Sequence, residues 1–257
     1  MLELRDITKV YNAGTDMELK LFDRFSLTVD EGQFVSIVGS NGSGKTSLLN
    51  IICGSAAADS GDVLVGGASI QKEKDYQRYR TMGRVYQDPS LGTCPNLTML
   101  ENLSLADNKG KSFGLGFGVN KRRIAFYRDE LASLGLGLEE KLHVRMGALS
   151  GGQRQAVALL MATMTPLNFL ILDEHTAALD PKTAEVIMEL TGKVVREKKL
   201  TAMMVTHNLR YAVEYGDRLL MLDKGQVILD RSGPEKAATS AQELLATFNR
   251  IGAGLDA

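Results

Sequence analysis

Alternating apolar and polar positions near the N-terminus predict two half-exposed β-strands. The alternation covers residues 2–7 and 25–29, and each stretch leads into turn-forming residues. A period of two is typical of a sheet with one face packed on a core and the other in water. These two stretches therefore favour antiparallel strands.

Three other stretches are apolar almost throughout and predict strands buried on both faces, as in a parallel sheet. They cover residues 34–38, 169–172 and 202–205. Between the last two, apolar residues at Ile187, Leu190 and Val194 have helical spacing. Asp180 is suited to the N-cap of that helix, and Pro181 to its first turn. Strands that alternate with helices indicate an α/β fold.

The chain changes character in its middle and again near its end. Residues 88–166 have mostly helical patterning. A stretch rich in glycine and basic residues, at 109–121, interrupts this pattern. We expect a helical subdomain there. Further on, apolar runs 219–222 and 227–229 flank a turn that contains Gly225, which predicts a β-hairpin.

Composition narrows the classes of protein. A length of 257 residues suits one elaborated domain, and 30 Lys plus Arg against 31 Asp plus Glu give a net charge of −1. No global basic field favours nucleic acid, so we expect no nucleic-acid partner. Cys53 and Cys94 are too few for a disulfide framework and fit a reducing cytosol. We expect neither a secretory leader nor a membrane span, since no apolar run approaches ~20 residues.

A glycine-rich loop follows the first buried strand and precedes a helical pattern. It has the spacing G-x-x-x-x-G-K-[ST] and consists of Gly39, Ser40, Asn41, Gly42, Ser43, Gly44, Lys45 and Thr46. Glycines let backbone N–H groups wrap a phosphate, and a helix N-terminus adds its positive dipole end. Lys45 is placed to reach the β- and γ-phosphates, and the Thr46 hydroxyl to ligate Mg²⁺. The predicted ligand is ATP.

Two carboxylates end the buried strand at 169–172. Asp173 can hold the Mg²⁺ shell, and Glu174 can orient or deprotonate an attacking water. An acid at this position also serves as a helix N-cap or a loop residue. The phosphate loop earlier in the chain favours the catalytic interpretation.

A second anion site is predicted at Ser150, Gly151, Gly152 and Gln153. Serine caps a helix, and the two glycines leave its first N–H groups unobstructed. An ordinary capped helix is the alternative for these residues in isolation. Two anion sites for one nucleotide favour the ligand-binding interpretation.

With Leu149 to Gln153 just upstream of residues 169–174, the chain closely resembles the nucleotide-binding subunit of ATP-binding-cassette (ABC) transporters. The resemblance covers almost the whole chain, and seven motifs fall in the family's order. Besides the three motifs described above, they include the stretch 178–180 and the residues Tyr11, Gln87 and His207. The resemblance implies Tyr11 at the adenine-stacking position and Ser47 beside the nucleotide. It also implies Gln87 as a ligand of Mg²⁺ or the water, and His207 on the γ-phosphate.

The same resemblance implies an architecture and an assembly. The expected fold is α/β: a parallel-sheet P-loop core with an antiparallel β subdomain at 1–87 and 167–240, an inserted helical subdomain at 88–166, and a short C-terminal helix at 241–257. Two subunits, identical or closely related, would sandwich each ATP head to tail. An integral-membrane permease, which usually docks near residues 97–103, and an extracytoplasmic solute-binding protein would complete a complex at the cytoplasmic face of the membrane.

The direction of transport and the cargo rest on analogy. Residues 174–180 and the basic stretch most resemble bacterial importer subunits for aromatic amino acids (tryptophan or tyrosine) or branched-chain amino acids. An export or lipoprotein-releasing ATPase is the alternative within transport, and a soluble ABC ATPase of DNA repair or translation is the alternative outside it.

Some remaining features are expected to be structural. His175 stands where the family more often has proline, and neither His175 nor His143 has a metal-ligand cluster beside it in sequence. The glycines at 114–118 lack dinucleotide-loop spacing. The basic residues at 109–123 suit a solvated surface better than a site for anionic headgroups or an acidic partner loop.

Overall fold

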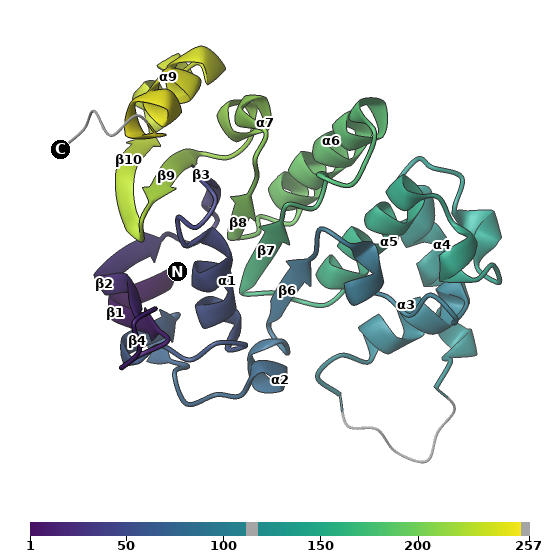
Figure 1. The fold of residues 1–257 in the computed structure, drawn as a ribbon. Helices are drawn as coiled ribbons and strands as arrows, with labels where there is room; N and C mark the ends of the chain where they lie inside the picture. The colour runs from purple at the N-terminus through teal and green to yellow at the C-terminus, as the bar shows by residue number, and fades with distance from the viewer. Residues whose placement is uncertain (112–117, 253–257) are drawn as a thin grey trace. The chain divides into compact units, whose positions relative to one another are not determined.

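The computed structural model describes residues 1–111 and 118–252. The chain forms two compact units. The first contains Met1–Tyr79 and Lys199–Ala257, and the second contains Arg80–Lys198. Both units contain strands and helices (Figure 1).

An antiparallel sheet in the first unit has the strand order β2-β1-β4-β5. These strands are β1 (Leu2–Tyr11), β2 (Leu19–Val29), β4 (Ser60–Val65) and β5 (Ala68–Ser69). Leu2 pairs with Val29 and Leu4 with Leu27, and all four side chains are buried. Both strands predicted from alternation are confirmed, although β2 begins at Leu19, earlier than its alternation indicated.

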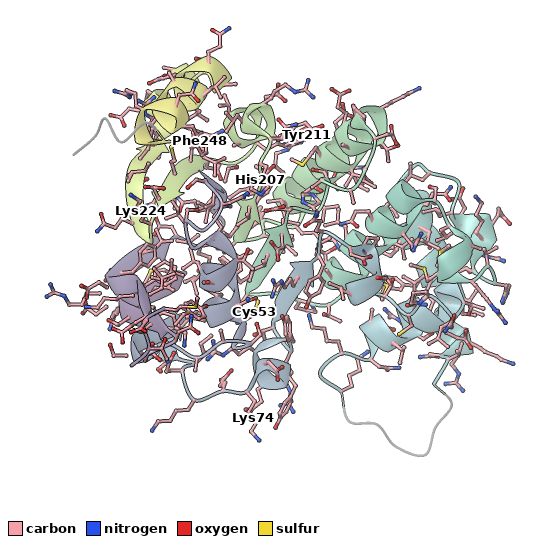
Figure 2. All side chains as sticks on the ribbon, viewed as in Figure 1. Cys53, Lys74, His207, Tyr211, Lys224 and Phe248 are labelled. Atoms are coloured by element: carbon pink, nitrogen blue, oxygen red, sulfur yellow. The ribbon has the colours of Figure 1, made fainter. Side chains whose placement is uncertain are left out.

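Among the other strands of the first unit, β3, β8 and the middle of β9 are buried, as continuous apolar runs predict, whereas the residues of β10 are exposed or half-buried. β3 (Phe34–Gly39) is parallel to β8 (Ala202–Val205) and to β9 (Arg218–Asp223), and β9 forms the expected hairpin with β10 (Gln226–Ser232). The helices are α1 (Lys45–Cys53), α2 (Asp75–Arg78), α7 (Leu209–Glu214), α8 (Gly233–Ala238) and α9 (Ala241–Gly252). Leu244 and Phe248 of α9 pack with Val38, Ala212 and Met221 (Figure 2 labels Phe248).

The described residues of the second unit form two parallel strands, four α-helices and four short 3₁₀ turns. Its strands are β6 (Met82–Val85) and β7 (Phe169–Asp173). Its α-helices are α3 (Met99–Asp107), α4 (Ile124–Ala132), α5 (Gly151–Thr163) and α6 (Pro181–Glu197). Short 3₁₀ turns cover Pro89–Leu91, Lys121–Arg123, Glu139–Lys141 and Met146–Ala148.

Side-chain caps fix where the longer helices of this unit begin. Thr98 and Ser150 form capping boxes at α3 and α5, and Asp180 accepts a hydrogen bond from Thr183 N at the start of α6. The caps at 150 and 180 were expected from sequence. The buried stripe of α6 differs from prediction, since Val195 is buried, Val194 is only half-buried, and polar Thr191 lies on the stripe.

Within residues 1–111 and 118–252, the structure contains no helix that is both long and apolar enough to cross a bilayer.

Candidate nucleotide site

The glycine-rich loop has the strand–loop–helix context that its motif requires. Every residue of β3 is buried up to Gly39, and α1 begins at Lys45. Gly44 is the N-cap and has a φ of +105°, a left-handed conformation that L-residues avoid. A Cβ on Gly44 would lie 2.9 Å from Phe22 Cζ. Glycine is therefore required at this position by both conformation and space.

Lys45 points back into this loop. Its ammonium donates hydrogen bonds to the carbonyl oxygens of Gly39 (2.8 Å) and Ser40 (2.9 Å), and the residue is only 5% exposed. An ammonium held by loop carbonyls is a preformed positive centre for a phosphate. The position fits the predicted role of Lys45.

A hairpin distant in sequence holds the same loop. Ser40 Oγ donates to Asp223 Oδ1 (2.9 Å), and Gly225 N donates to the carbonyl of Ser43 (2.9 Å). Sequence reasoning predicted this turn but not its contact with the loop. The β9–β10 turn thus fixes both ends of the segment 40–43.

Tyr11 and Ser47, both predicted near the nucleotide, are brought together in the first unit. The Tyr11 hydroxyl lies 2.9 Å from Ser47 Oγ, and the Lys9 ammonium lies 5.3 Å from the centroid of the Tyr11 ring. The ring at the end of β1 is thereby placed against the first turn of α1. Thr46, between Lys45 and Ser47, is exposed.

His207 lies exposed at the junction between β8 and α7 (Figure 2). The next residue, Asn208, caps α7 by accepting hydrogen bonds from Arg210 N (3.0 Å) and Tyr211 N (3.2 Å). A buried strand before the histidine and a capped helix after it fix the backbone on both sides.

In the second unit, Asp173 ends β7 and forms an ion pair that sequence reasoning missed. Arg84 of the adjacent strand β6 donates to Asp173 Oδ2 at 2.6 Å, and the two side chains are 8% and 16% exposed. The guanidinium also lies 4.7 Å from the centroid of the Tyr86 ring. The only signal in the sequence is one charged residue inside the short strand Met82–Val85.

Gln87 follows this strand and is exposed. The carbonyl of Tyr86 accepts a hydrogen bond from the buried Gln155 amide of α5 (3.0 Å), and Asp88 caps the next turn by accepting from Ser90 N (2.8 Å). Sequence reasoning did not identify Gln155. These anchors on both sides fix the backbone at Gln87.

Ser150 and Gln153 cap α5 reciprocally, each side chain accepting from the backbone N–H of the other at 3.3 Å. Gly152 faces α6 closely, since a Cβ there would lie 2.2 Å from Thr183 Cγ2. A Cβ on Gly151 would lie 3.3 Å from Leu179 Cδ2. The second predicted anion site is therefore a helix start at which Ser150 and Gly151 are exposed and Gly152 is buried against the start of α6.

The structure gives His175 an internal partner. The ring is 2% exposed, and its Nε2 lies 3.0 Å from Thr191 Oγ1 of α6. Burial lowers the pKa of His175 to about 4, so the ring is neutral at physiological pH. His143 is exposed, and the described residues include no group of three His, Cys, Asp or Glu side chains placed to hold a metal ion.

The basic stretch is less solvated than expected. The Lys109 ammonium donates to the carbonyl of Met82 (2.6 Å), and burial lowers its pKa to about 8. Asp107 accepts from the Tyr127 hydroxyl (2.9 Å) and forms ion pairs with Lys111 (3.4 Å) and Arg123 (2.6 Å). Part of the positive charge is thus neutralised internally. Gly114 and Gly116 lie outside the described residues.

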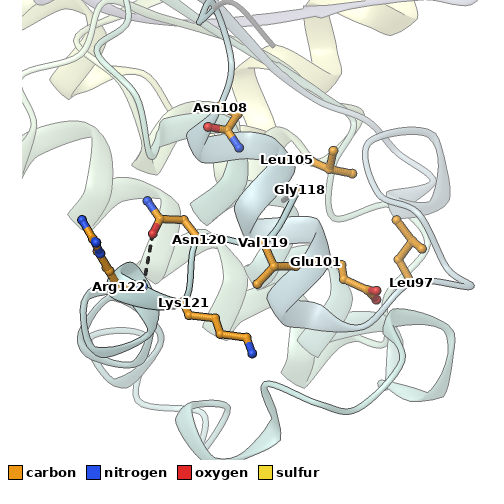
Figure 3. A pocket seen from close by; sticks show the side chains of 9 residues that line it. All are labelled: Leu97, Glu101, Leu105, Asn108, Gly118, Val119, Asn120, Lys121 and Arg122. Atoms are coloured by element: carbon orange, nitrogen blue, oxygen red, sulfur yellow. Dashed lines mark hydrogen bonds between the residues drawn. The ribbon is translucent and has the colours of Figure 1, made fainter. Parts of the chain in front are cut away.

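A pocket of about 800 Å³ opens beside α3 in the second unit (Figure 3). Leu97, Glu101 and Leu105 border it, as do residues 118–122. Leu105 was expected on an apolar helical stripe but is 42% exposed, whereas Leu100 and Leu103 are buried. The pocket lies in the region where the sequence predicts contact with a permease.

Each predicted site residue thus lies in one of the two units. Tyr11, the loop 39–47 and His207 belong to the first. Gln87, residues 150–153, and the pair Asp173 and Glu174 belong to the second.

Comparison with known proteins identifies the family of this chain. Residues 22–177 match the ABC transporter family. The chain is 44% identical over 248 residues to the tyrosine transport ATP-binding protein of Clostridioides difficile, with 96% of this chain and 98% of the relative covered. It is 30% identical to the phosphonates import ATP-binding protein PhnC of Lactococcus lactis, with 93% and 95% covered.

Solved structures agree. The dimeric post-hydrolysis state of the ATP-binding cassette MJ0796, bound to ADP and Pi, aligns with a TM-score of 0.74 at 32% identity and covers 90% of this chain and 98% of its own. The ADP conformation of the cassette MJ1267 aligns with a TM-score of 0.79 at 25% identity and covers 100% and 99%. The expected ABC ATPase fold is confirmed. This chain belongs to the ABC transporter family, as an ATP-binding subunit whose ATPase activity is coupled to transport.

Proposed function

We propose that this chain binds MgATP, dimerises around two nucleotides and drives import of an aromatic amino acid, tyrosine or a close analogue, by a separate membrane permease. The observation that carries the cargo is the 44% identity to a tyrosine transport ATP-binding protein across nearly the whole of both chains.

In this proposal, the loop from Gly39 to Thr46 binds the phosphates and Lys45 supplies the positive charge. Thr46, Gln87 and Asp173 hold Mg²⁺. Their hydroxyl, amide and carboxylate oxygens are the hard donors that Mg²⁺ prefers. When bound, Mg²⁺ neutralises charge that develops on the β- and γ-phosphates.

Glu174 orients the attacking water and accepts its proton, and His207 donates a hydrogen bond to the γ-phosphate. The place of Glu174 directly after Asp173, at the end of a strand whose other four residues are apolar and buried, supports this role. Tyr11 stacks on the adenine, and its hydroxyl contact with Ser47 supports this placement.

Ser150, Gly151, Gly152 and Gln153 bind the nucleotide of a partner subunit, which is a second copy or a related chain. The exposed start of α5 offers N–H groups and a positive dipole end to a phosphate. The dimeric state of the MJ0796 cassette supports this assembly.

The pocket beside α3 is our candidate surface for the permease. Its rim has the exposed Leu105, and Leu91, close to Gln87 in sequence, is 70% exposed. An exposed leucine on the rim of a pocket supports a protein interaction site there. An extracytoplasmic solute-binding protein would deliver the amino acid to the permease, and this subunit would lie at the cytoplasmic face of the membrane.

Two variants test the nucleotide chemistry separately. Glu174→Gln should keep ATP affinity, reduce hydrolysis by at least about 10²-fold and accumulate an ATP-bound dimer, because only the proton acceptor is lost. Lys45→Ala should instead lose ATP affinity, since the phosphates lose their cation. Turnover and equilibrium binding of a fluorescent ATP analogue report the two effects. Hydrolysis at the wild-type rate by Glu174→Gln would remove Glu174 from its proposed role.

Cargo is tested in vesicles that contain this subunit with the permease that co-purifies with it. ATP-dependent uptake of labelled tyrosine, absent with Glu174→Gln, is the expected result. Uptake of a branched-chain amino acid alone would reassign the cargo, and export of solute or release of lipoprotein would reassign the direction. If no membrane protein co-purifies with this subunit, a role as an ABC ATPase that does not act in transport would be favoured.

A further inference from the structure

His175 is the buried polar residue nearest in sequence to the proposed proton acceptor, and it has no part in the nucleotide chemistry proposed for this chain. It directly follows Glu174, and its side chain is 2% exposed. A buried imidazole costs free energy unless its polar atoms are hydrogen-bonded. Its contact with Thr191 is therefore informative.

The hydrogen bonds around Thr191 have a defined direction. Thr191 Oγ1 lies 2.7 Å from the carbonyl oxygen of Ile187, which can only accept. The hydroxyl has a single hydrogen, so it donates to Ile187 and must accept from His175 Nε2 at 3.0 Å. The imidazole is consequently protonated at Nε2, and the chain His175–Thr191–Ile187 runs in one direction into α6.

Glu174 has a conformation that requires such support. Its φ is +48°, in the left-handed region, which is strained for a non-glycine residue. Such residues persist where the surrounding structure fixes them. Two hydrogen bonds hold the backbone around Glu174. Ala177 N donates to the carbonyl of Glu174 at 2.9 Å, and the ring of the next residue, His175, is hydrogen-bonded to Thr191 of α6.

α6 is a firm anchor for this tie. The helix has 17 residues, begins with Pro181 after the Asp180 cap, and buries Ile187, Thr191 and Val195 along one face. Thr191 lies in its interior, well away from the ends that fray. A side chain bonded there is held by the packing of the whole helix.

We propose that His175 is a positioning residue for Glu174: the Nε2–H to Thr191 hydrogen bond fixes the peptide after Glu174 and keeps its carboxylate aimed for hydrolysis. His175 does not touch the nucleotide in this proposal. The inference rests on the proposed role of Glu174 as the group that activates water.

Thr191→Val tests the tie at a distance from the nucleotide. Valine has the shape of threonine without its hydroxyl, so His175 Nε2–H loses its acceptor. We expect kcat for ATP hydrolysis by the full chain to fall roughly tenfold or more while KM and ATP affinity stay within about twofold, because misplacement of a catalytic group affects the chemical step. Thr191→Ser keeps the hydroxyl and should restore kcat to within about twofold of wild type.

Thr163→Val is the matched control. Thr163 is a buried threonine of α5 in the same unit, and its hydroxyl likewise donates to the carbonyl four residues earlier, Leu159 (2.9 Å). It should leave kcat unchanged. A wild-type kcat in Thr191→Val, an equal loss in Thr163→Val, or a change in KM alone would overturn the proposal.

A second measurement leaves His175 and Thr191 unchanged. The chain has three histidines, so the ¹⁵N–¹H long-range correlations of their rings can be assigned with His143→Gln and His207→Gln. We expect the Nε2–H tautomer for His175. An Nδ1–H tautomer would contradict the direction of the hydrogen-bond chain and overturn the inference.

Glu174→Gln, measured in parallel, separates the two levels of the argument. If it hydrolyses ATP at the wild-type rate, the proposed role of Glu174 fails. If it loses hydrolysis but Thr191→Val does not, the role of Glu174 stands and the positioning role of His175 fails.

Discussion

Gly152→Ala should destabilise the second unit, whereas the same change at the neighbouring Gly151 should not. Both glycines lie in the first turn of α5 and neither has a positive φ, so alanine suits both backbones. Their surroundings differ. A new methyl group at Gly152 would lie 2.2 Å from Thr183 Cγ2, and at Gly151 it would lie 3.3 Å from Leu179 Cδ2.

Two opposing contributions to the free energy of unfolding set the size of this effect. Alanine in place of glycine favours a helix by up to ~1 kcal/mol, and this term is shared by the two variants. Overpacking costs ~1–3 kcal/mol, and a 2.2 Å approach forces Thr183 or the facing helix start to move. The terminal methyl of Leu179 can shift by a few tenths of an ångström at little cost. Gly152→Ala should thus be about 1–3 kcal/mol less stable than Gly151→Ala.

Urea denaturation followed by circular dichroism measures this difference, provided that the two variants have equal m-values. Thr183→Ser removes the methyl group that the new Cβ would meet, so it should restore stability in the Gly152→Ala background. Equal stability of the two alanine variants, or no rescue by Thr183→Ser, would refute the steric account of Gly152.

Two further changes test charges that sequence reasoning did not place. Arg84→Met should cost up to about 3 kcal/mol in unfolding free energy, because it leaves the largely buried Asp173 carboxylate without its cation. Adding Asp173→Asn should recover part of that loss; a strictly additive double variant would argue against the coupling. Lys109→Gln keeps a donor for the Met82 carbonyl and removes the charge. Burial lowers the folded-state pKa of Lys109 from 10.5 to about 8, so the folded state binds fewer protons between these values and stability rises with pH there. The advantage of Lys109→Gln over wild type, measured by denaturation, should accordingly be full below pH 8 and vanish towards pH 10.5; an advantage independent of pH would contradict this account.

The sequence predicted the features that depend on local chemistry. Gly44 could be identified because a left-handed N-cap beside a phosphate loop tolerates almost no other residue. Ser150 and Asp180 could be identified as helix caps because a cap bonds to a backbone N–H only a few residues away. The roles of Tyr11 and Gln87 came from the family resemblance and stay predictions.

Contacts between distant polar side chains could not be predicted in this way. Arg84 and Asp173 are 89 residues apart, and their pairing depends on the register of β6 against β7. Ser40 and Asp223 are 183 residues apart, and the β9–β10 turn brings the carboxylate to the loop. No spacing rule connects such positions.

His175 shows most clearly which features the sequence determines and which the tertiary structure decides. The sequence by itself determined that a histidine follows Glu174, that a buried strand precedes it and that an Asp180-capped helix follows. Only the tertiary structure decided that its ring faces Thr191 on that helix, since a helical stripe can hide a polar residue whose partner is not in the pattern. Local sequence specifies backbone hydrogen bonds within a few residues, whereas packing selects which buried side chains meet.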